Sequence, residues 1–196
     1  MRSHRHRAAA ALVVATALLG GCSETTAGTA SAGPTSATSA TAEPSPSARP
    51  STTRPKKVDL TGIDSCAALS DAQKRQFDLV KTPGTLKSSV YADATLCSIN
   101  SSDFSYGVGL VAAAKNGVEE YAPGVEKGEL TPVRVAGFPA LTGKSTTLLP
   151  SCTVYLDVAD GQMIDLGVDS TKVPMEELCV RARKIAEAII QTVSAR

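Results

Sequence analysis

The stretch SCTVYLDVADGQMIDLGVD, residues 151–169, alternates apolar and polar side chains on both sides of an Ala-Asp-Gly segment. This alternation is typical of two half-buried antiparallel strands. A two-residue turn would pair Leu156 with Asp165 and mix the two faces. A three-residue loop, Ala159-Asp160-Gly161 with Gly161 left-handed, pairs Leu156 with Ile164 instead. We therefore predict a bulged hairpin with one apolar face.

The opposite face of this hairpin carries three side chains that suit a binding site. Tyr155 stands between Asp157 and Asp165. An aromatic ring flanked by carboxylates favours a cationic or hydroxylated partner, through cation–π contact and charge-assisted hydrogen bonds. The alternative is a solvated sheet surface on which Tyr155 is an ordinary strand former.

The residues after the hairpin predict a C-terminal amphipathic helix. Pro174 suits its first turn, where Glu176 and Glu177 complement the helix dipole. The apolar stripe at helical spacing consists of Leu178, Ala182, Ile185, Ala186, Ile189 and Val193. We expect this stripe to pack across one face of a sheet.

Shorter segments upstream predict the rest of an α+β domain over residues 58–196. Strand patterns occupy residues 95–99, 104–110 and 133–135, and Ser70 to Gln73 is a capping box that opens a helix. Together with the hairpin they predict an antiparallel sheet of about five strands, packed by the C-terminal helix.

The first 57 residues have a different composition, which indicates export and anchoring. A basic start precedes an apolar run over residues 8–19 that is too short to span a bilayer. The run ends in Leu19-Gly20-Gly21-Cys22, which resembles a bacterial lipobox. We expect residues 1–21 to be a lipoprotein signal peptide and Cys22 to be acylated; an ordinary secretory signal with an incidental cysteine is the alternative.

Residues 22–57 are expected to form a lipidated, disordered tether. From Ser23 to Lys57 there is no Leu, Ile, Val, Met, Phe, Tyr or Trp, so the segment cannot bury a core. As a flexible coil it would reach about 30–35 Å. Loss of the three arginines of the signal segment changes the formal net charge from +1 to −2. Membrane attachment would therefore depend on the lipid.

Four further cysteines lie in the predicted domain: Cys66, Cys97, Cys152 and Cys179. An even number of cysteines in an exported chain favours two disulfides, for which three connectivities exist. A zinc site is the alternative, but the domain has no C-x-x-C pair and both histidines precede Cys22. We expect no metal and no cofactor.

The sequence offers little for catalysis. Without a histidine after the signal segment, a Ser-His-Asp or Cys-His arrangement is impossible. Residues 137–145, GFPALTGKS, have five residues between the glycines where a phosphate loop has four, so a turn leading into a polar strand is the better interpretation. No charge block indicates nucleic acid. We expect a non-catalytic binding or accessory module; the alternative is a small carboxylate-dependent cell-envelope hydrolase using Asp157 and Asp165.

The order of these features resembles that of a known family. The features are the lipobox, the Ser/Thr/Pro tether, DSCAALS (64–70), the Cys97 strand, VAGFPA (135–140), CTVYL (152–156) and Cys179 on the last helix. They are similar to a family of actinobacterial lipoproteins with a domain of unknown function. The resemblance implies the sequential disulfides Cys66–Cys97 and Cys152–Cys179 and no catalytic residue. From the lipobox we expect the domain to lie on the extracytoplasmic face of the membrane, with an unknown envelope protein or small ligand as its partner.

Overall fold

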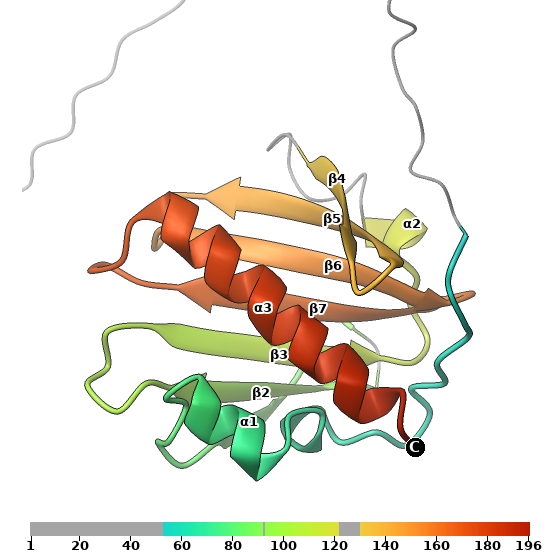
Figure 1. Cartoon of the computed structure of the whole chain (residues 1–196), viewed down its shortest axis with the longest axis horizontal. Helices are drawn as coiled ribbons and strands as arrows, with labels where there is room; N and C mark the ends of the chain where they lie inside the picture. The colour runs from blue at the N-terminus through green and yellow to red at the C-terminus, as the bar shows by residue number, and fades with distance from the viewer. Residues whose placement is uncertain (1–52, 92, 122–129) are drawn as a thin grey trace, which may run out of the picture. The chain divides into compact units, whose positions relative to one another are not determined.

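The computed structural model describes residues 53–91, 93–121 and 130–196. Its elements are η1 (Ser65–Ala67), α1 (Asp71–Gln76), β1 (Gly84–Lys87), β2 (Thr95–Asn100), β3 (Gly107–Ala113), α2 (Val118–Tyr121), β4 (Thr131–Val135), β5 (Phe138–Ser145), β6 (Ser151–Ala159), β7 (Gln162–Asp169) and α3 (Met175–Val193) (Figure 1). Cys22, the signal segment and most of the predicted tether lie outside the described residues. No helix in the described part is long and apolar enough to cross a membrane.

The fold is α+β, and its antiparallel sheet has seven strands instead of about five. The strand order is β1-β2-β3-β7-β6-β5-β4. The sequence does not signal β1, because all four of its residues are exposed at the sheet edge and no apolar alternation marks it. The pattern of β5 is weakened by Pro139 and Gly143, two residues that are unfavourable inside strands.

The predicted hairpin register is confirmed. Leu156 pairs with Ile164 on the apolar face, and Gly161 has a left-handed φ of 65°. The predicted three-residue loop, however, is wrong. Ala159 pairs with Gln162, so only Asp160 and Gly161 form the turn, and the extra residue lies between Asp157 and Ala159 within β6. The apolar face is preserved because the bulge, wherever it lies, offsets the register by one residue.

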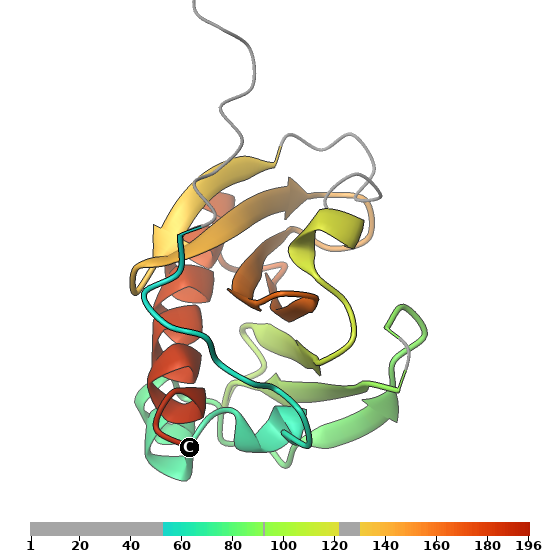
Figure 2. The same cartoon turned by 90° about the vertical axis from the view of Figure 1, so that its right-hand side faces the viewer.

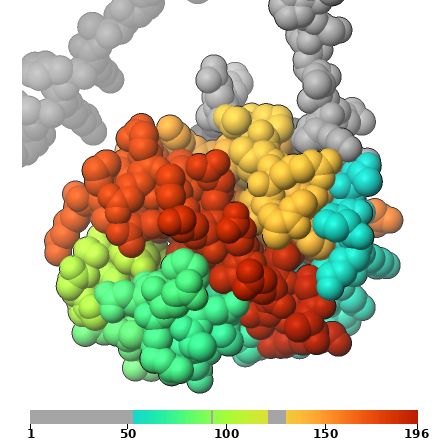
Figure 3. Space-filling view, viewed as in Figure 1, coloured from blue at the N-terminus to red at the C-terminus, as the bar shows by residue number. Residues whose placement is uncertain are grey.

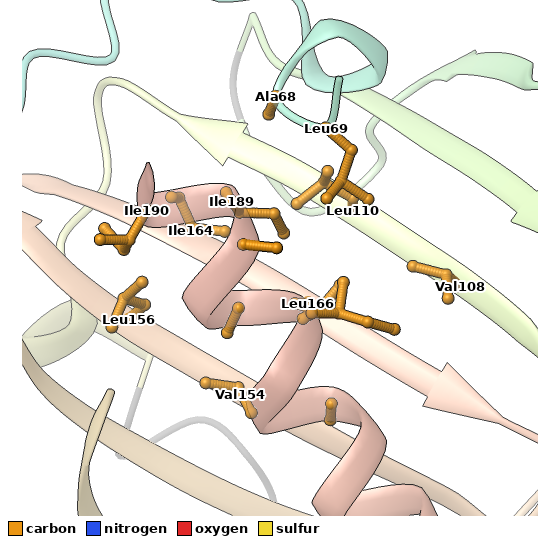
Figure 4. Packing of buried hydrophobic residues seen from close by; sticks show 14 of the residues in the cluster. Ala68, Leu69, Val108, Leu110, Val154, Leu156, Ile164, Leu166, Ile189 and Ile190 are labelled. Atoms are coloured by element: carbon orange, nitrogen blue, oxygen red, sulfur yellow. The ribbon is translucent and has the colours of Figure 1, made fainter. Parts of the chain in front are cut away.

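The helix α3 packs diagonally across one face of the sheet, as predicted (Figure 1). All six residues of its apolar stripe are buried. Figure 4 shows how side chains from α3, β3, β6 and β7 fill the layer between helix and sheet. Beside α3, the segment containing η1 and α1 covers the β2–β3 side of the same face (Figures 1 and 3).

The sequential disulfides that the family resemblance implies are both present. Cys66–Cys97 joins η1 to β2, and Cys152–Cys179 joins β6 to α3. Each bridge therefore ties a helical element to the sheet face that it covers. Under the loop-entropy account, loops of this length contribute about 3–4 kcal/mol each.

Folded contacts begin before residue 58, where the domain is predicted to start. Arg54 forms ion pairs with Asp157 at 2.7 Å and Asp160 at 2.6 Å, next to the β6–β7 turn. The amide of Val58 donates to the Val158 carbonyl, and the Val58 side chain is buried in the main core. The last residues of the predicted tether thus pack against the hairpin.

Candidate binding face

The sheet face opposite α3, which we call the back face, consists of rows of residues that pair from strand to strand. The central row contains Leu86, Leu96, Val111, Asp165, Tyr155, Leu141 and Pro132. The next row contains Gly84, Ser98, Gly109, Gly167, Thr153 and Gly143. The outermost row, nearest the β2–β3 and β5–β6 connections, contains Asn100, Gly107, Asp169, Ser151 and Ser145. The predicted binding residues Tyr155 and Asp165 belong to the central row.

Tyr155 and Asp165 lie side by side, but not on a free surface. The Asp165 carboxylate accepts a 2.5 Å hydrogen bond from the Tyr91 hydroxyl. Tyr91 is 4% exposed and belongs to a second hydrophobic cluster, against which Tyr155 packs. Burial raises the pKa of Asp165 to about 6, opposed by the Tyr91 hydrogen bond, and raises the pKa of Tyr155 to about 12, helped by the Asp165 charge.

This second cluster covers the middle of the central row, from Leu96 to Leu141. Val118 of α2 and Tyr91 and Ala94 of the β1–β2 connection pack onto the sheet there, on the side away from α3 (Figure 2). At these positions the back face is therefore covered by other parts of the domain. Alternation along one strand shows which side chains share a face, but not which distant segment folds over them.

Asp157 has a different role from the one its position suggested. Its side chain accepts from Arg54 Nε at 2.8 Å, and the residue is only 8% exposed. Burial raises the pKa of Asp157, whereas the Arg54 hydrogen bond and charge oppose this shift. The carboxylate thus holds the N-terminal segment against the hairpin, while Asp165 is held by Tyr91.

We call the row that contains Gly109 and Gly167 the glycine row. It leaves a strip of the back face without large side chains. A Cβ at Gly167 would meet only the Thr153 hydroxyl at 3.8 Å, and one at Gly109 would meet Leu96 at 3.5 Å. Both are ordinary contact distances, and neither glycine has a positive φ. The packing of the described residues therefore does not require glycine at these positions. Glycine within a strand often marks a place where another molecule or chain approaches the backbone closely.

Two polar side chains of the outermost row converge over a third glycine. The position of a Cβ on Gly107 is 3.1 Å from Asn100 Oδ1 and 3.3 Å from Asp169 Oδ1. Within the described ranges, no hydrogen bond or ion pair reaches the Asp169 carboxylate, and burial alone raises the pKa of Asp169. Oxygen atoms of both side chains therefore approach the same place above Gly107. The sequence indicates that Asp169 belongs to this face. It lies four residues after Asp165, and residues an even number of positions apart in a strand share a face.

The fold and this face define a disulfide-bonded α+β domain whose helix covers one side of a seven-stranded antiparallel sheet. The chain belongs to the family described as Protein of unknown function (DUF3558), whose match covers residues 17–192. The match thus extends from the predicted signal segment to α3. No curated protein and no solved structure matches the chain.

Proposed function

We propose that this protein is a lipid-anchored, extracytoplasmic lipoprotein whose domain is a non-catalytic binding module for a cationic or hydroxylated ligand. The observation that carries the proposal is the half-buried Asp169 carboxylate, which has no partner among the described residues and converges with Asn100 over Gly107. A desolvated carboxylate gains most from a ligand that brings a positive charge or hydrogen-bond donors.

The neighbouring rows fit a ligand that lies flat on the sheet. Gly109 and Gly167 leave the backbone accessible, and the half-exposed side chains of Ser98 and Thr153 add hydroxyl groups that both donate and accept. An ammonium group or a sugar hydroxyl at Asp169 could therefore be accompanied by contacts along the glycine row. This moves the proposed site from Tyr155 toward the outer end of the same face.

The anchor rests on the lipobox. Acylation of Cys22 with a diacylglyceryl group would hold the mature chain stably, whereas a single acyl chain binds membranes only marginally. The Ser/Thr/Pro-rich segment would then act as a spacer between the membrane and the domain.

The geometry favours binding over the carboxylate-dependent hydrolase. Such a reaction needs two carboxyl groups that can reach a substrate together, one as acid and one as base or nucleophile. Here Asp157 is occupied by Arg54 and Asp165 by Tyr91. Each of the two carboxylates is therefore already bound by a side chain of the domain.

Amide spectra of three glycines on the back face provide the test for binding. Spermidine, as a cation, and maltotriose, as a hydroxylated chain, are titrated into the isotopically labelled protein while the amide signals of Gly107, Gly109 and Gly167 are followed. We expect one probe to shift these three signals, and Asp169→Asn to weaken the effect at least fivefold. Glu187→Gln is the matched control, because it removes the same charge from the exposed surface of α3. Unshifted glycine signals, or equal binding by Asp169→Asn, would refute the proposed site.

Cell fractionation provides the test for the anchor. The wild-type chain is expected in the membrane fraction, whereas the Cys22→Ala variant should be absent from it. A variant that stays fully membrane-bound would show that Cys22 is not the point of attachment.

A further inference from the structure

Of the seven large apolar side chains that are exposed in the described part of the domain, four lie at one end of the sheet. Val80, Phe104, Leu148 and Leu149 all lie in connections at this end. We call it the loop end and define it by residues 77–83, 101–106, 146–150 and 170–174. In Figure 1 three of these connections, 101–106, 146–150 and 170–174, lie together at the left, opposite the β6–β7 turn.

Hydrogen bonds join these connections into one surface. The Ser170 amide donates to the Pro150 carbonyl, and the Ser170 hydroxyl donates to the Ser105 carbonyl at 2.5 Å. On the other side, the Ser102 amide donates to the Asp78 carbonyl. Hydrogen bonds therefore hold the backbones of these connections together.

Phe104 is the most unusual residue of the loop end. It is 63% exposed and has a φ of 54°, a left-handed conformation that is rare for a bulky side chain. The loop holds it there: the Phe104 amide donates to the Ser101 carbonyl, and the Asp103 carboxylate accepts from the Ser105 amide at 2.9 Å. Strained backbone that the surroundings over-determine is concentrated at functional sites. At Phe104 this strained backbone carries an exposed aromatic ring.

Charge near the ring also fits a membrane interface. Lys81 Nζ lies 4.8 Å from the Phe104 ring centroid. Lysine beside aromatic and aliphatic side chains is typical of surfaces that enter the headgroup region of a bilayer, because the ammonium can stay in water while the apolar groups enter.

The spacing of the apolar tips favours a bilayer over a protein partner. The β2–β3 connection with Phe104 and the β5–β6 connection with Leu148 are three strand spacings apart, which is about 14 Å. A bilayer accepts separate protrusions anywhere along its surface. A protein would need a matching pocket at each of these points.

The place where the predicted tether joins the domain allows this contact. Arg54 fixes the chain at the β6–β7 turn, at the opposite end of the strands from the loop end. The nine residues of β6 span about 30 Å, and a flexible tether of about thirty residues has a similar average reach, about 30 Å. A tether of this length is therefore long enough for the loop end to touch the membrane.

We propose that the loop end docks onto the bilayer that holds the lipid anchor, with Phe104 and Leu148 entering the headgroup region. This rests on the proposed function, since the anchor supplies the high local concentration that makes a weak surface contact effective. The chain that follows the signal segment has a formal net charge of −2, so anionic lipid would not attract it and the contact depends on apolar insertion.

Tryptophan fluorescence tests the docking directly, because the natural chain contains no tryptophan. The mature, lipidated chain is reconstituted in phosphatidylcholine vesicles, with or without brominated acyl chains, as single variants Phe104→Trp and Leu148→Trp. Leu86→Trp is the matched control, since Leu86 is as exposed as Phe104 but lies on β1, away from the loop end. We expect both loop-end variants to be quenched by brominated lipid at least twofold more strongly than the control, and to be blue-shifted.

The outcomes separate the docking from the anchor. If the chain does not float with the vesicles, the anchor is wrong and the docking falls with it. If the chain floats but all three variants are quenched equally, or only by aqueous iodide, the anchor stands and the docking is overturned. The loop end would then face solution, as a protein partner requires. Leu148→Trp keeps the test decisive if Phe104→Trp disturbs its strained loop.

Discussion

The Tyr91 hydroxyl donates a hydrogen bond to the Asp165 carboxylate, which connects the segment between β1 and β2 to the centre of β7. Asp165 is the only charged residue in the central row of the back face. Its nearest neighbours in that row are Val111 and Tyr155. The bond therefore does two things. It satisfies a carboxylate within a hydrophobic cluster, and it holds the Tyr91 segment over the sheet.

Stability should fall as the pH rises through the range in which Asp165 ionises. Burial raises the pKa of Asp165 from 3.8 to about 6, so the folded state holds this proton more tightly than the unfolded state does. The free-energy cost of ionising the buried Asp165 carboxyl is absent below about pH 4 and complete above about pH 6. At pH 7.5 we expect Asp165→Asn to be more stable than the wild type by about 2–3 kcal/mol. Urea unfolding at pH 4.5 and 7.5 measures this; a difference between the two proteins that does not depend on pH would contradict it.

Arg54→Ala should destabilise the domain although Arg54 lies in the predicted tether. The change leaves Asp157, which is almost buried, without its partner, and we expect a loss of about 2 kcal/mol in the free energy of unfolding. Limited proteolysis should also cut closer to residue 58 in the variant. Arg183→Ala, on the exposed side of α3, is the control; equal cleavage and stability of the two variants would argue against the Arg54 contact.

Non-reducing peptide mapping should find Cys66 linked to Cys97 and Cys152 linked to Cys179. Replacing both members of the second pair with alanine should lower the free energy of unfolding by about 3 kcal/mol, because the bridge closes a loop between β6 and α3. A peptide joining Cys66 to Cys152 would be incompatible with this topology.

Two glycines should respond in opposite ways to substitution by alanine. Gly167→Ala adds a methyl group at an ordinary contact distance, and we expect stability to be unchanged or raised by about 0.5 kcal/mol. Gly137→Ala is expected to cost about 1 kcal/mol or more, since Gly137 has a φ of 84° and its Cβ would lie 3.2 Å from Pro55. Thermal unfolding compares them. If Gly167→Ala proved the more harmful, the glycine row would have a packing role.

The sequence by itself determined the elements whose signals are local. The alternation in residues 151–169 was enough to predict which residues of β6 and β7 face the core, because a one-residue shift would expose the apolar set. The stripe on α3 identified the buried side of the helix for the same reason. The cysteine pairing needed the family resemblance in addition, because four cysteines alone allow three connectivities.

Tertiary structure alone decided which of the polar residues on the back face are free. Arg54 and Asp157 are 103 residues apart, and Tyr91 and Asp165 are 74 apart. Nothing in the neighbourhood of either carboxylate encodes its partner, because such pairs form only when the sheet brings distant segments together. The edge strand β1 escaped prediction for a related reason, since its pairing with β2 supplies order that its own exposed residues do not. Periodicity assigns a side chain to a face, whereas long-range packing decides whether that face stays open to a ligand.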